Sequence, residues 1–261
     1  MSIPRNTIGM LNKVPQATLI FWIIKIMSTT VGETGADYLA VHVGLGTAIT
    51  GGIMLALLVA ALLAQLRARQ YVPWRYWLTV VLVSVVGTQI TDFLTDKLEV
   101  SLYVSTAVFA LILAAIFAIW YATERTLSIH TIVTRRRELF YWAAILFTFA
   151  LGTAAGDLAT EELMMGFNLG VLAFGVLIAA IAAAYYLGAN AVLTFWVAYI
   201  LTRPLGASLG DLLSQSRPNG GLGLGTVHTS IGFLVVIVTL VAVLSIGPNA
   251  PKTQAKAIEE A

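Results

Sequence analysis

Four aspartates recur at a fixed distance behind four tryptophans, and their carboxylates are the side chains best placed for chemistry. A Gly lies ten residues after each Trp, and the Asp follows five residues later. The four sets are Trp22, Gly32 and Asp37; Trp77, Gly87 and Asp92; Trp142, Gly152 and Asp157; and Trp196, Gly206 and Asp211. Carboxylates held at one depth by equivalent helices would repel one another, and so would take up protons or bind a cation.

Other oxygen-bearing side chains lie within one helical turn of these aspartates. They are Glu33, Gln89, Thr153 and Ser208. Because the chain has no cysteine, this pattern suits a hard cation or Mn²⁺ better than copper or zinc. We predict an ion-binding site formed by Glu33 and the four aspartates, with Asp37, Asp92, Asp157 and Asp211 as metal ligands. The alternative is that these aspartates end their helices in the outer headgroup region, where water solvates them.

Two cationic residues, Lys25 and Arg203, interrupt strongly apolar segments, and Arg203 precedes Pro204. Charges inside a bilayer are costly and usually functional. We predict that both side chains lie deeper than the carboxylates, toward the Trp residues, and that they pair with carboxylates or bind an anionic group. The alternative for Lys25 is that its long side chain reaches back to the membrane surface.

The composition places these residues in a membrane protein. Of the 261 residues, 59% are hydrophobic and 11% are charged, and mean hydropathy is +0.88. A soluble domain carries about 25% charged residues. The net charge of +2 gives no indication of nucleic-acid binding. We expect an all-α integral membrane protein with eight transmembrane helices, near residues 17–40, 43–66, 74–95, 101–122, 138–160, 165–187, 189–213 and 225–247.

The Trp–Gly–Asp spacing divides this single membrane domain, 1–261, into four tandem two-helix units. The predicted units are 14–70, 71–131, 132–188 and 189–248, followed by a cytoplasmic tail, 249–261. Two spans per unit make the repeats parallel, related by an axis along the membrane normal. The Gly lies about 140° around the helix from the Asp, so we expect it to allow close approach of another helix.

The orientation follows from the distribution of Lys and Arg. Eleven of them fall in both terminal regions and in the loops between units, and two fall on the opposite side. The positive-inside rule therefore predicts that both termini are cytoplasmic.

The repeat resembles a known family. Residues 21–25 (FWIIK), 134–142 (TRRRELFYW), 152–157 (GTAAGD) and 202–207 (TRPLGA) are similar to bacterial membrane proteins of the DUF347 repeat family. The resemblance implies the same fold and a multi-pass location in the bacterial inner membrane. It implies no catalytic residues, because the role of the family is not assigned.

Two classes of function remain open. The first is a secondary transporter or exporter of a small ion or solute, slightly favouring a divalent cation such as manganese and driven by proton or ion coupling. The second is a non-transporting membrane protein: a sensor, a scaffold or a membrane enzyme. We expect that the protein is not an enzyme and binds no cofactor, because the sequence contains no nucleophile–base pair, zinc motif or nucleotide-binding motif. The expected partners are the small ion or solute and the lipid bilayer. Whether the protein forms a homo-oligomer is an open question at this point. A polar path from the aspartates to the cytoplasm would favour transport, and a solid apolar core the second class.

Overall fold

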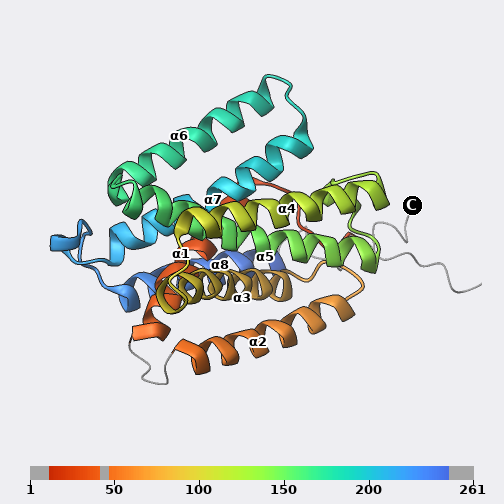
Figure 1. The fold of residues 1–261 in the computed structure, drawn as a ribbon. Coiled ribbons are helices and arrows are strands. Elements are labelled where there is room, and N and C mark those ends of the chain that lie inside the picture. The colour runs from red at the N-terminus through yellow and green to blue at the C-terminus, as the bar shows by residue number, and fades with distance from the viewer. Residues whose placement is uncertain (1–11, 42–46, 247–261) are drawn as a thin grey trace, which may run out of the picture.

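The computed structural model describes residues 12–41 and 47–246, which contain eight α-helices (Figure 1). The helices are α1 Leu19–Val41, α2 Thr47–Arg67, α3 Pro73–Asp92, α4 Leu102–Glu124, α5 Arg135–Asp157, α6 Gly166–Tyr186, α7 Ala191–Ser214 and α8 Thr226–Ile246. Two single-turn π-helices follow α3 and α5, and two 3₁₀ turns precede α5 and α8. The prediction of an all-α fold is confirmed, since the described residues contain no strand.

Seven of these eight helices, α2 to α8, are long and apolar enough to cross a membrane. The exception is α1, which carries Lys25, Glu33 and Asp37 within its 23 residues. Its polar character fits its position, because α1 packs against α3, α7 and α8. The chain is therefore a multi-pass membrane protein.

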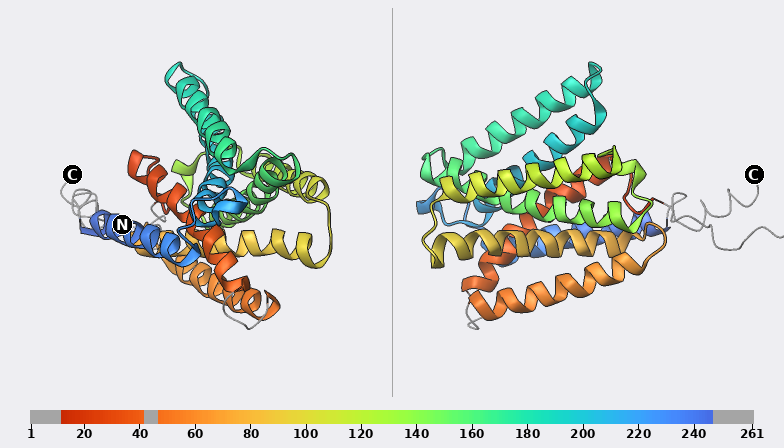
Figure 2. Two further views of the ribbon diagram at one scale, coloured as in Figure 1. Left: turned by 90° about the vertical axis from the view of Figure 1, so that its left-hand side faces the viewer. Right: turned by 45° about the vertical axis from the view of Figure 1, so that its right-hand side comes forward.

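The four odd-numbered helices form a closed inner ring. Each packs against the next around the circle: α1 on α3, α3 on α5, α5 on α7, and α7 on α1. In their most apolar windows, 50–61% of the residues of α3, α5 and α7 are buried, compared with 6–22% in the even-numbered helices. The even-numbered helices therefore form an outer layer, and Figure 2 shows α2 and α6 projecting on opposite sides of the ring.

Each outer helix packs chiefly on the inner helix of the following unit. Thus α2 lies on α3, α4 on α5 and α6 on α7, and α8 returns to α1. The two helices of a single unit touch much less, as α1 and α2 illustrate. The units consequently interlock, and α8 closes the circle by joining the last unit to the first.

The repeated glycines lie where neighbouring ring helices come closest. A Cβ atom on any of them would collide with a side chain of the next inner helix. The pairs are Gly32 with Ser84, Gly87 with Phe149, Gly152 with Arg203, and Gly206 with Thr29. In all four pairs, the residue that faces the glycine lies seven residues after the Trp of its own unit. The ring is therefore held by one contact between helices that is repeated four times.

Candidate functional site

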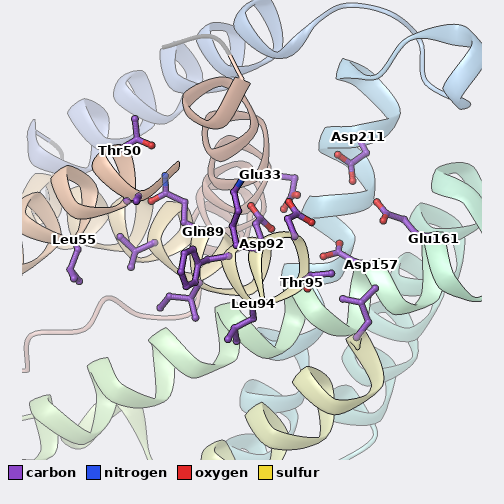
Figure 3. A pocket seen from close by; sticks show the side chains of 18 of the residues that line it. Glu33, Thr50, Leu55, Gln89, Asp92, Leu94, Thr95, Asp157, Glu161 and Asp211 are labelled. Carbon is purple, nitrogen blue, oxygen red and sulfur yellow. The ribbon is translucent and has the colours of Figure 1, made fainter. Parts of the chain in front are cut away.

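A cavity of about 640 Å³ lies at one end of the ring (Figure 3). Six carboxylates and one ammonium group line it: Glu33, Asp92, Asp96, Asp157, Glu161, Asp211 and Lys97. Figure 3 shows the carboxylates of Glu33, Asp92, Asp157, Glu161 and Asp211 gathered on the side of the ring helices. The lining therefore carries a strong excess of negative charge, which attracts cations.

The cavity is also partly apolar. Toward α2 and the end of α3 its lining includes Leu55, Ile90, Phe93, Leu94 and Leu102. In Figure 3, Leu55 lies away from the cluster of carboxylates. A molecule bound here would meet carboxylates on one side and hydrocarbon on the other.

Two π-helical turns bring additional acidic residues to the cavity. Phe93–Lys97 follows Asp92 directly, and Leu158–Glu162 follows Asp157. Asp96 and Glu161 occupy the same position in these turns, four residues after the repeated Asp, and both line the cavity. Single π-helical turns are frequent at functional sites. These two residues are not part of the ion site predicted from the sequence, although their common spacing from the repeated Asp could have indicated them.

Arg203 lies beneath the cavity and joins all four inner helices. Its Nη2 atom donates hydrogen bonds to Glu33 Oε2 at 2.6 Å, to Thr153 Oγ1 at 2.7 Å and to Thr88 Oγ1. These three acceptors each lie eleven residues after the Trp of their unit, on α1, α3 and α5. The guanidinium therefore lies at the centre of the ring, and the side chain is fully buried.

Lys25 lies closer to the Trp residues and crosses the ring to its far side. Its Nζ is 4.0 Å from the centroid of the Phe149 ring on α5 and 4.3 Å from that of Tyr199 on α7. The side chain is 1% exposed, so it does not reach back to the membrane surface. Among the described residues no hydrogen-bond acceptor contacts Nζ, and the aromatic faces provide its visible stabilisation.

A layer of aromatic side chains fills the ring below Lys25. Phe21 packs on Trp77, Phe195 and Tyr199, and the hydroxyls of Tyr76 and Tyr141 hydrogen-bond to each other. These rings are all buried, and none of them is among the described residues that line the cavity. The cavity thus ends above Lys25, and a packed apolar barrier lies between it and the other end of the ring.

The predicted site residues are largely brought together. Glu33, Asp92, Asp157 and Asp211 line the cavity, while Arg203 and then Lys25 follow along the ring toward the Trp residues. The side chain of Asp37 lies outside the described residues. In the part of the chain that the structure describes, no three carboxylate or imidazole groups are arranged to hold a metal ion. The metal site formed by Asp37, Asp92, Asp157 and Asp211 stays a prediction, because the side chain of Asp37 lies outside the described residues.

This fold and cavity define a class: a multi-pass α-helical membrane protein built from four tandem units around an acidic cavity. The chain belongs to the family described as Repeat of Unknown Function (DUF347), whose model matches residues 20–71, 75–126, 140–189 and 194–246. The resemblance and the fourfold internal repeat are thereby confirmed. Comparisons with curated proteins and with solved structures found no match.

Proposed function

We propose that this protein is a secondary transporter that moves a small cation across the bacterial inner membrane. The observation that carries the proposal is the acidic cavity at one end of a closed helix ring, with six carboxylates and one lysine in its lining. Binding sites of many transporters lie where repeated units meet. A cavity open at one end with a packed barrier below it fits one state of an alternating-access cycle.

The ion pair beneath the cavity supplies a mechanism for release. Glu33 lines the cavity and also accepts a hydrogen bond from Arg203. A cation that enters would compete with the guanidinium for this carboxylate. Carboxylates alone would hold a cation too tightly, since binding must stay weak enough for it to leave. Return of Arg203 to Glu33, or protonation of the cavity carboxylates, would weaken the site and free the cation.

The lining favours a cation with a hydrocarbon body, such as a small amine. The cavity is wide, it combines carboxylates with Leu55 and Leu94, and its described residues provide no three-ligand metal site. Manganese is the second candidate, because all the polar ligands are oxygen atoms. Ligation would then include water or Asp37.

The alternative is a non-transporting membrane protein, and the aromatic barrier is the observation that favours it. Uptake into liposomes decides between the two. Purified protein should exchange a labelled amine or ⁵⁴Mn²⁺ against a proton gradient. Asp157→Asn should abolish exchange, because it removes a cavity charge and keeps the shape. Asp37→Asn should do the same. Glu124→Gln, which lies outside the cavity at the far end of α4, is the control. Full activity in the single Asp→Asn variants, or no exchange of any cation in the panel, would refute the proposal.

The proposed topology has eight spans, including α1, parallel repeats and both termini in the cytoplasm. The clustering of basic residues in the loops between units and at the adjoining helix ends supports it: Arg67, Arg69, Arg75, Arg125 and Arg135. The cavity then opens to the outside. Cysteines at Gln70 and Thr131 should react only with reagent on the cytoplasmic side, and one at Asn219 only from outside. Outside labelling of the first two would reverse the orientation.

A further inference from the structure

A second buried ion pair lies at the end of the ring opposite the cavity. Lys13 Nζ donates to Glu138 Oε2 at 2.6 Å, and each side chain is 1% exposed. The same ammonium donates to the backbone carbonyl of Leu66 at 3.1 Å. Neither Lys13 nor Glu138 belongs to the cavity or to the aromatic layer.

This pair joins three parts of the chain beyond the aromatic layer. Lys13 precedes α1, Leu66 lies in the last turn of α2, and Glu138 lies in the first turn of α5. Glu138 is one turn before Trp142, whose ring packs against Tyr76 with 5.6 Å between centroids. The pair therefore covers the aromatic layer on the side away from the cavity.

The segment that carries Lys13 is fastened to this end of the ring. The backbone amide of Lys13 donates to the carbonyl of Ile132, and Val14 is buried in the core. Ile132 itself is 1% exposed and lies in the loop that connects the second and third units. Opening this end of the ring would consequently require the segment before α1 to move.

The small net stability of a buried ion pair allows this contact to break and re-form. A buried ion pair adds little net stability, whereas removing one partner leaves an isolated buried charge and costs several kcal/mol. If this end opens to water, both charges are solvated and the cost disappears. The stability of the closed state therefore depends on the presence of both partners, whereas the stability of the open state depends on neither.

We propose that Lys13 and Glu138 form the gate that closes the ring at the end opposite the cavity. The gate opens when their ion pair separates and residues 12–18, the described residues before α1, move aside. This inference rests on the proposed transport function, in which the bound cation leaves through this end. Lys13 and Glu138 bind no substrate; they hold the barrier closed while the cavity is open.

A cysteine reporter tests the gate without knowledge of the substrate. The chain has no native cysteine, and Ala144→Cys adds a single thiol at a fully buried position six residues after Glu138. A membrane-impermeant thiol reagent is added to the full-length protein in liposomes, from the side of the gate. Lys13→Met and Glu138→Gln should each raise the labelling rate at least about tenfold, because an unpaired buried charge shifts the population toward the open end.

Two further variants separate a gate from a general loss of structure. The exchanged pair, Lys13→Glu with Glu138→Lys, should return labelling toward the parent rate. Arg137→Gln breaks an ion pair of the same end, Arg137 Nε to Glu124 Oε2 at 2.8 Å, in which the side chains are 22% and 13% exposed. It should leave labelling unchanged.

Unchanged labelling in both single variants, or an equal rise in Arg137→Gln, would overturn the gate. If a single variant fails to fold, the exchanged pair decides, since parent-like folding and labelling support the gate and misfolding counts against it. Labelling as expected together with no cation exchange would refute the transport function and leave the gate standing. Cation exchange with unchanged labelling would refute the gate alone.

Discussion

The two ends of the inner ring each hold a buried ion pair with the same separation of 2.6 Å, but their surroundings differ. Glu33 lines a wide acidic cavity, and its partner Arg203 also donates hydrogen bonds to hydroxyls on two other helices. Lys13 and Glu138 lie behind packed aromatic rings and contact one further backbone carbonyl. In the mechanism that we propose, an entering cation competes with Arg203 for Glu33 at the cavity end, and the other end stays dry until its gate opens.

The fourfold pattern also differs between the two ends. At the aromatic end, every unit contributes a pair of rings before and at the repeated Trp. Eleven residues beyond the Trp, the units carry Glu33, Thr88, Thr153 and Ala207. This departure from symmetry is what allows one arginine to be held by three different helices. The residues that repeat in all four units thus form the aromatic barrier, and the position at which the units differ forms the charged centre.

The largest effect is expected from Arg203→Met. It leaves the Glu33 carboxylate without its partner beneath the cavity and removes three hydrogen bonds between helices. We expect the free energy of unfolding in detergent to fall by about 3–5 kcal/mol. Denaturant titration monitored by circular dichroism measures it. The double variant with Glu33→Gln should recover part of the loss; no recovery would mean that the ion pair is not the source.

The next effect is expected from Gly87→Ala in the ring. The new Cβ would lie 2.7 Å from Phe149 Cβ, so α3 and α5 would have to separate. We expect a loss of about 1–3 kcal/mol in the same titration. Gly175→Ala on the outer helix α6 is the matched control, because its Cβ would meet nothing within 4 Å. Equal effects of the two substitutions would contradict the close approach of the ring helices.

A smaller effect is expected from the hydroxyl pair in the aromatic layer. Tyr141→Phe leaves the buried hydroxyl of Tyr76 without its partner. Unfolding experiments should show a loss of about 1 kcal/mol. The double variant Tyr76→Phe/Tyr141→Phe should be nearly neutral, since no polar atom is then left unpaired. A double loss equal to two single losses would show that the hydroxyls do not act as a pair.

The smallest effect on stability, with a clear effect on function, is expected from Lys25→Met. The ammonium has no hydrogen-bond acceptor among the described residues, so an apolar side chain of similar length should fit without loss. Stability should stay equal or rise, while the turnover of cation exchange falls more than the apparent affinity. A large drop in stability with unchanged turnover would mean that Lys25 stabilises the fold and has no role in transport.

Much of this architecture could be predicted from the repeat alone. The Trp–Gly–Asp spacing gave the number of units, the close approach at Gly32 and its equivalents, and the shared level of Asp92, Asp157 and Asp211, because helix rise and rotation are fixed per residue. The interlocking of the units could not be predicted. Sequence spacing places a residue on its own helix but does not say which helix faces it, so the packing of α2 on α3 was not foreseen.

The sequence by itself determined that this chain is a helical membrane protein of four equivalent units, with carboxylates near one end and tryptophans near the other. Only the tertiary structure decided the partners of its buried charges. Glu33 and Arg203 are 170 residues apart, and Lys13 and Glu138 are 125 apart. A charge far along the chain leaves no local trace in the spacing around its partner. The closed ring, set by helix packing through the glycines, is what brings each pair within hydrogen-bond distance.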